Sequence, residues 1–161
     1  MEFRAKDKYF SLKRSFERLK KISTNNGNRI SNTEAKDAVE DFFNRCYHFK
    51  DWLIKDAAVR IYKKNTSVEE YISNSNNLSI AADYCNSYKH AGLDRDPRYK
   101  HSLSQVNNDV IINFTPNGAI TSGRIRITIE NNTFDAFKIA SECIKEWDLF
   151  LEKNNIVFDN P

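Results

Sequence analysis

Glycine and proline are scarce in this chain, whose 161 residues include four Gly and three Pro. Both residues interrupt helices, so their scarcity favours long helices over a fold with many tight turns. No apolar run approaches the roughly 18 residues that span a bilayer, and the charged segment Met1–Lys8 does not resemble a secretory signal. We therefore expect a cytoplasmic protein that makes no contact with a membrane.

Cysteine is also rare, and its placement argues against metal or disulfide chemistry. Cys46, Cys85 and Cys143 lie far apart, and none belongs to a CxxC pair. Each falls on the apolar face of a separate predicted helix, so we expect three small, buried, unreactive core residues. The chain has no phosphate-binding loop, nucleophile elbow or metal-ligand cluster. No cofactor and no metal site are therefore expected.

Charge is nearly balanced overall but unevenly spread. The net charge is +3, while residues 1–30 hold nine Lys or Arg against three acidic residues, and residues 130–161 hold three Lys against seven acidic residues. Such polarity can attract a phosphate backbone to the basic end, although a basic helix is more often a solvated face. The length suits a single domain over residues 1–161.

Apolar residues recur at helical spacing in most of the chain. The spacing predicts helices over about 2–23, 31–56, 78–91 and 133–154, the last of them capped by Asn132 or Thr133. Ser31 with Glu34 forms a capping box at the start of the second helix, and Ser67 with Glu70 predicts a further short helix through Ser73. The second helix has the richest apolar face and should form the centre of the core: Ala35, Val39, Phe42, Phe43, Cys46, Phe49 and Leu53.

A β-hairpin is predicted at about 108–130, before the last helix. Val110–Phe114 and Arg124–Ile129 are rich in β-branched residues, and Pro116–Gly118 is a turn signal between them. Ile125, Ile127 and Ile129 should face the core. The fold class that follows is mainly α, an antiparallel helical bundle with a β-hairpin inserted before the C-terminal helix.

The segment Asn86–His90 packs an amide, a cation and an imidazole into five residues. At about 100° per residue, Asp83, Asn86 and His90 should share one outward side of their helix, opposite Ala81, Cys85 and Tyr88. The second helix carries a similar polar stripe of Asn44, His48, Asp51 and Lys55. If the two stripes adjoin, within one chain or across a dimer, two imidazoles and several carboxylates and amides converge.

That inventory suits metal-free cleavage of RNA. The ribose 2′-hydroxyl needs a proton acceptor that works near neutral pH, which His90 or His48 supplies. The anionic phosphorane needs donors, which Lys89, Asn86 or an arginine supplies. The simpler interpretation is that these side chains solvate their helices, and that His48 and Asp51 form a local hydrogen bond between residues i and i+3.

The segments Phe42–Leu53 and Asp83–His90 resemble the HEPN superfamily, small helical bundles of prokaryotic toxin and phage-defence systems. The resemblance implies RNA or nucleotide binding, a homodimer and a cognate partner protein, with metal-independent ribonuclease activity in active members. Those members carry an Arg separated from the catalytic His by four to six intervening residues, whereas the corresponding positions before His90 hold Asp83, Tyr84 and Cys85. His90, with Asn86 as its polar partner, is what the resemblance transfers.

One segment matches the Arg-to-His spacing literally, from Arg95 to His101. Pro97 argues against a regular helix there, so a chance match is the simpler interpretation. The cations of this segment still form a reasonable contact for nucleic acid, because they pair with phosphates while Tyr99 can stack on a base. The residues expected to bind nucleic acid are Lys89, Arg95, Arg98 and Lys100, beside the catalytic candidates His90, Asn86, His48 and Asp51.

Two other functions remain open at this stage. A non-catalytic bundle, acting as an interaction module or accessory subunit, explains the missing arginine directly. Metal-dependent hydrolysis through His48, His90 and Asp51 is less favoured, because the sequence shows no tight ligand spacing.

Overall fold

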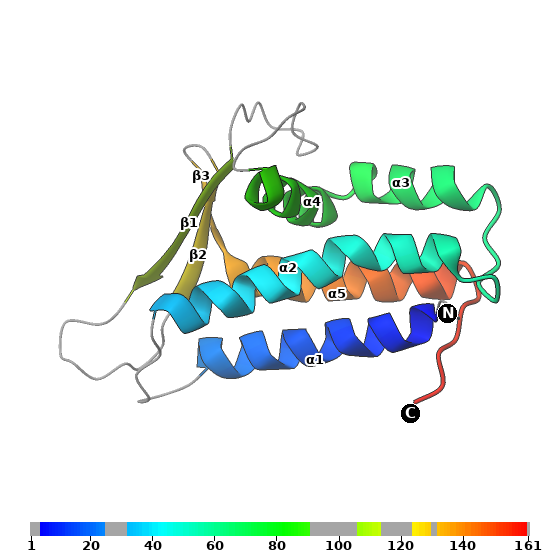
Figure 1. Ribbon diagram of the computed structural model, residues 1–161, viewed down its shortest axis with the longest axis horizontal. Helices are drawn as coiled ribbons and strands as arrows, with labels where there is room; N and C mark the ends of the chain where they lie inside the picture. Colours follow the sequence, from blue (N-terminus) through cyan, green and yellow to red (C-terminus); the bar gives the residue numbers. More distant parts are fainter. Residues whose placement is uncertain (1–3, 25–31, 91–105, 114–123, 130–131, 161) are drawn as a thin grey trace.

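The structure, a computed structural model, describes residues 4–24, 32–90, 106–113, 124–129 and 132–160 (Figure 1). For some residues inside these ranges, 87–90 among them, it describes the backbone path alone. The described chain is mainly helical and forms five helices and three strands. The prediction of a mainly α helical bundle with a β-hairpin before the last helix is confirmed.

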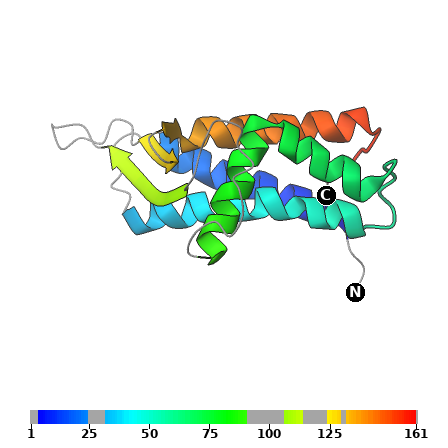
Figure 2. The same ribbon diagram turned by 90° about the horizontal axis from the view of Figure 1, so that it is seen from above.

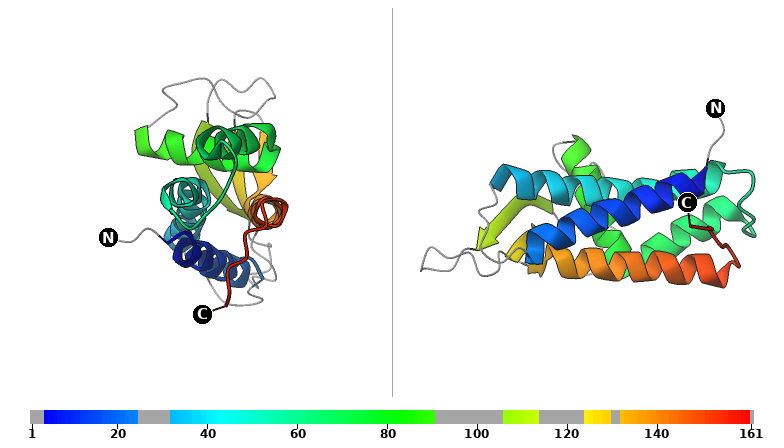
Figure 3. Two further views of the ribbon diagram at one scale, coloured as in Figure 1. Left: turned by 90° about the vertical axis from the view of Figure 1, so that its right-hand side faces the viewer. Right: turned by 90° about the horizontal axis from the view of Figure 1, so that it is seen from below.

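Three long helices lie side by side along the molecule: α1 (Ala5–Thr24), α2 (Asn32–Lys55) and α5 (Ala136–Lys153). α1 runs antiparallel to the other two (Figures 1 and 3). The Tyr9 hydroxyl and the Lys13 ammonium group both donate to the Asp148 carboxylate, at 2.7 and 2.8 Å, and so join α1 to α5. The Trp147 indole donates to the Cys46 carbonyl at 3.2 Å and joins α5 to α2.

The core lies between these helices and is rich in aromatic rings. The largest fully buried side chains include Trp147, Tyr84, Phe42, Phe43 and Phe49. Burying a side chain of this size contributes roughly 2 kcal/mol or more. All seven residues of the apolar face predicted for α2 are buried, so the placement of this helix at the centre of the core is confirmed.

Two shorter helices cover α2 on the side away from α1 (Figure 1): α3 (Lys64–Asn74) and α4 (Asn76–His90). The Ser75 hydroxyl oxygen accepts the Leu78 amide at 2.9 Å and caps α4. The predicted start of α3 at Ser67 is wrong, because the helix already begins at Lys64. The Ser67 amide makes a helical bond to the Lys63 carbonyl, and its hydroxyl donates to the Tyr62 carbonyl instead of capping.

Three strands close the end of the bundle where α2 and α5 begin (Figure 1): β1 (Val106–Asn113), β2 (Arg124–Ile129) and β3 (Asn132–Asp135). They form an antiparallel sheet in the order β1-β2-β3, with β1 against α2 and α4 and β2 against α5. Ile125 and Ile127 are buried, as their alternation predicted. The expected turn at Pro116–Gly118 and the Ser31 cap lie outside the described residues.

The start of the last helix differs from the prediction. Asn132 and Thr133 pair with β2 as part of β3 instead of capping the helix. Asp135 is the N-cap of α5, because its carboxylate accepts the Lys138 amide at 2.9 Å. The residues expected to open the helix therefore extend the hairpin into a third strand.

Candidate functional site

A polar stripe runs along α2, as its spacing predicted. Asn44, His48, Asp51 and Lys55 recur every three or four positions, so one face of the helix carries them all. The His48 and Asp51 side chains are 47% and 41% exposed. This half-exposed position leaves both within reach of solvent and of a ligand.

His48 and Asp51 are hydrogen-bonded, with 3.2 Å between Nδ1 and a carboxylate oxygen. A carboxylate oxygen accepts hydrogen bonds, and on this ground we assign the proton of the bond to Nδ1. In the neutral ring Nε2 is then an acceptor, which is the form that a general base needs. The local hydrogen bond between residues i and i+3 considered for this pair is confirmed.

Cys85 lies on α4, the helix that packs against α2, and its side chain contacts the polar stripe. Its Sγ lies 3.0 Å from Asn44 Oδ1 and 3.5 Å from His48 Nε2. The Cys85 thiol donates its one proton to Asn44, and its contact with His48 Nε2 is weak. Seen from above, α4 crosses α2 at a steep angle (Figure 2).

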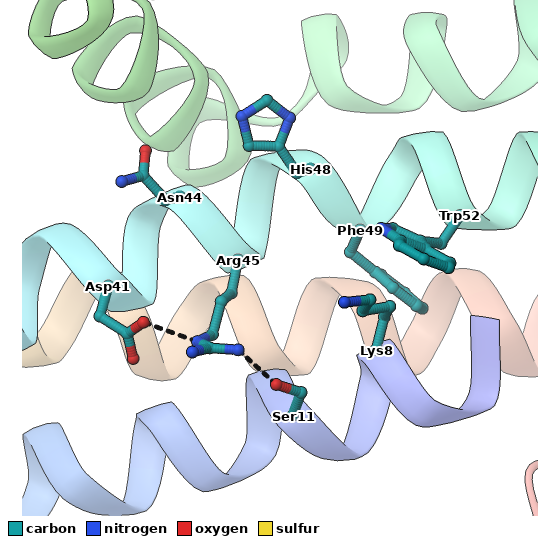
Figure 4. Close-up of a pocket in the computed structure, with 8 residues that line it drawn as sticks. All are labelled: Lys8, Ser11, Asp41, Asn44, Arg45, His48, Phe49 and Trp52. Atoms are coloured by element: carbon teal, nitrogen blue, oxygen red, sulfur yellow. Dashed lines mark hydrogen bonds and ion pairs between the residues drawn. The ribbon is translucent and has the colours of Figure 1, made fainter. Parts of the chain in front are cut away.

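A groove about 260 Å³ in volume lies between α1 and α2, with His48 and Asn44 at its rim (Figure 4). Closed ligand pockets begin at about 300 Å³, so this groove suits part of a polymer better than a whole small molecule. Its lining combines cations, aromatic rings and amide groups: Lys8, Ser11, Asp41, Asn44, Arg45, His48, Phe49 and Trp52.

Arg45 is held in the middle of this groove (Figure 4). Its Nε donates to Asp41 at 2.7 Å, and an Nη donates to the Ser11 hydroxyl. Guanidinium carries five N–H donors, so further donors stay available for an anion. The Asp41 carboxylate offsets part of the positive charge but also orients the guanidinium group.

Lys8 and Trp52 form the end of the groove nearest the N-terminus of α1. The Lys8 ammonium group lies 4.3 Å from the centre of the Trp52 ring, a cation–π contact. Phe49 is buried behind them. A cation beside a partly exposed indole is a combination that contacts both a phosphate and a base.

The structure does not bear out a shared outward side for Asp83, Asn86 and His90 among the residues it describes. Asp83 is 1% exposed, so its prediction is wrong: α2, α3, α5 and β1 surround this part of α4 and bury every residue from 78 to 85. Asn86 is partly buried, and its Nδ2 has no hydrogen-bond partner among the described residues. The side chains of Lys89 and His90, and all of Arg95, Arg98 and Lys100, lie outside the described part.

All three cysteines are buried and reduced, as predicted. Burial, followed by a hydrogen bond with Cys46, raises the pKa of the Cys143 thiol well above its ordinary value. Cys85 differs from both because polar side chains border it. Nothing in the sequence pattern signalled this contact, since it depends on the angle at which α4 crosses α2.

Two further findings concern the described residues as a whole. They contain no group of three or more His, Cys, Asp or Glu side chains that could hold a metal ion. None of their helices is long and apolar enough to cross a membrane.

Comparisons with known proteins give no match: no protein-family model, curated protein or solved structure is similar to this chain. The resemblance to the HEPN superfamily therefore depends on the motif residues of the sequence alone.

Proposed function

We propose that this protein is a HEPN-like domain that binds RNA and cleaves it without a metal ion. The observation that supports the proposal is the His48–Asp51 pair at the rim of a groove that also holds Arg45, Lys8 and Trp52. One helix thus supplies a proton acceptor with a defined tautomer, and the groove beside it supplies cations and a ring. These are the groups that metal-free RNA cleavage requires.

In the proposed reaction, His48 Nε2 takes the proton from a ribose 2′-hydroxyl. The 2′-oxygen attacks the adjacent phosphorus, the bond from phosphorus to the 5′-oxygen breaks, and that oxygen leaves with a proton from a second donor. The products are a 2′,3′-cyclic phosphate and a 5′-hydroxyl. His90, at the end of the helix that carries Cys85, is the second donor that the sequence nominates.

The groove would hold the strand for this step. Arg45, oriented by Asp41 and Ser11, is placed to pair with a phosphate, and its remaining donors stabilise the charge of the phosphorane. Lys8 adds a second cation, and Trp52 offers a face on which a base can stack. Asp51 is a positioning residue, because it acts on the substrate through His48.

The cellular role that we propose follows from the resemblance to the HEPN superfamily. Such a domain would act in the cytoplasm as a homodimer in a toxin or phage-defence system, with a cognate partner protein that controls it. A second copy would supply additional groups to the strand, which compensates for the Arg that is missing before His90.

The test is the cleavage of single-stranded RNA in the presence of EDTA. We expect the wild-type protein to cleave it, His48→Ala to lower the rate about 100-fold or more, and Asp51→Asn to lower it less. Lys138→Gln, on the exposed surface of α5, is the control and should cleave as the wild type does. RNA affinity should change less than threefold in all variants.

Two results would count against the proposal in different ways. If the wild-type protein binds RNA but leaves it intact at high protein concentration, the non-catalytic bundle becomes the better account. If His48→Ala cleaves at the wild-type rate, the reaction occurs elsewhere on the protein or in a contaminant.

A further inference from the structure

The end of the molecule where α1 begins carries a concentration of positive charge. Two adjoining depressions, of about 460 and 570 Å³, share Val59 and Arg60 in their linings. We call this surface the basic end; its cations are Arg4, Lys6, Arg60, Lys63 and Lys64, from the start of α1, the loop after α2 and the start of α3. Figure 3 (left) faces this end.

The carboxylate of Asp56, at the basic end, forms hydrogen bonds within the protein. Among the described residues that line the two depressions, only Asp56 is acidic. Its carboxylate oxygens accept the amides of Ala5 at 2.7 Å and Ala58 at 2.9 Å, and its carbonyl accepts the Lys64 ammonium group at 2.8 Å. Asp56 is buried, so the charged side chains that the linings of the two depressions present to a ligand are cations.

Tyr62 stands out from the middle of this surface. It is 82% exposed, the Lys63 ammonium group lies 5.5 Å from its ring centre, and its carbonyl accepts the Ser67 hydroxyl. Lys63 holds the left-handed conformation, with φ 46°, which ends the loop in a defined turn. A large apolar ring held in the open by an ordered loop is well suited to stacking on a partner, since little freedom is lost on binding.

We propose that the basic end binds the single-stranded part of an RNA whose scissile phosphate lies in the groove; this inference rests on the proposed function. Cations around an exposed tyrosine fit a flexible strand, whose phosphates they pair with and whose unstacked base covers the ring. The two sites lie along the same stretch of α2, because Trp52 lines the groove, Asp56 lines the basic end, and the Asp56 amide bonds to the Trp52 carbonyl at 2.9 Å where α2 ends. From His48 to Asp56 the helix rises about 12 Å.

The test measures binding separately from cleavage. A fluorescent single-stranded 12-nucleotide oligouridine with 2′-O-methyl groups cannot be cleaved by 2′-attack, so its anisotropy reports affinity alone. We expect Tyr62→Ala to weaken binding about fivefold or more, and Tyr62→Phe to bind as the wild type does. Arg60→Gln should weaken binding and reduce the slope of log affinity against log salt by about 0.7, the loss of one phosphate contact.

Lys138 lies in the first turn of α5, which begins at the end of the molecule opposite the start of α1 (Figure 1). Lys138→Gln removes the same charge as Arg60→Gln and should leave the affinity within twofold. Equal losses in the two variants would mean that only total charge matters, and would overturn the inference. Unchanged binding by both Tyr62→Ala and Arg60→Gln would also overturn it, as would a duplex that binds as tightly as the single strand. These results leave cleavage by His48 untouched, whereas a wild-type protein that binds no RNA would reject both proposals.

Discussion

Hydrogen bonds from Asp56 connect the first turn of α1 to the loop that follows α2. The replacement of Asp56 by Ala tests how much these hydrogen bonds stabilise the fold. The amide of Ala5 is the first of the helix and has no partner within α1. The Asp56 carboxylate satisfies it at 2.7 Å and also accepts the Ala58 amide at 2.9 Å. Both Ala5 and Asp56 are buried.

The expected loss follows from these two bonds. A hydrogen bond to a charged group contributes about 1.5–3 kcal/mol, and a buried donor left without a partner keeps its full desolvation penalty. Ala58 is exposed, so water replaces the carboxylate at its amide and the loss there is small. We expect Asp56→Ala to lower the free energy of unfolding by about 2–4 kcal/mol. Asp56→Asn keeps one acceptor oxygen and should lose about half as much.

Urea unfolding followed by tryptophan fluorescence measures this, because Trp147 is fully buried in the core. The corresponding fall in melting temperature is about 5–15 °C for a domain of this size. Glu70→Ala, an exposed acidic residue of α3, is the matched control and should change stability by no more than about 0.5 kcal/mol. The reasoning is refuted if Asp56→Ala is as mild as this control.

Two further predictions concern the cysteines. Because burial holds the pKa of Cys143 above its ordinary value of 9.0, the folded chain keeps a proton that the unfolded chain loses. The contribution of the Cys143 thiol to the free energy of unfolding should be fully present below pH 9.0. Above pH 9.0 this contribution should fall by about 1.4 kcal/mol per pH unit. Cys143→Ala should flatten the fall measured in urea titrations, and an unchanged slope would contradict the prediction. Mass spectrometry after brief alkylation of the native protein should find Cys85 modified before Cys46 and Cys143, because Cys85 borders the half-exposed His48. If all three cysteines are labelled at the same rate, only global unfolding exposes Cys85, and the prediction is wrong.

The sequence was sufficient to locate the long helices along the chain, because their apolar positions repeat over many turns. The spacing on α2 placed both its buried face and the stripe with His48 and Asp51 correctly. Local capping signals were less reliable. Ser67 precedes a Glu by three residues, yet the turn at Lys63 starts α3 one turn earlier. Asn132 and Thr133 are residue types that favour helix caps, but their backbones pair with β2 as part of β3.

The candidate site could be predicted only as far as one helix determines it. An amphipathic pattern assumes one solvated face, and α4 has none between residues 78 and 85 because other elements surround it. The pattern of α4 alone therefore predicts an outward Asp83, whereas the side chain is buried. The contact of Cys85 with His48, and the groove between α1 and α2, depend on how helices cross, which the periodicity of one helix does not encode.

The measurement that tests the central claim most directly is the identity of the RNA ends after cleavage in EDTA. If His48 activates a ribose 2′-hydroxyl, mass spectrometry will find 2′,3′-cyclic phosphate and 5′-hydroxyl ends with the wild-type protein. The same ends will be absent with His48→Ala and with 2′-O-methyl RNA. Products with 5′-phosphate ends, or cyclic phosphate ends that form equally with His48→Ala, would contradict the account.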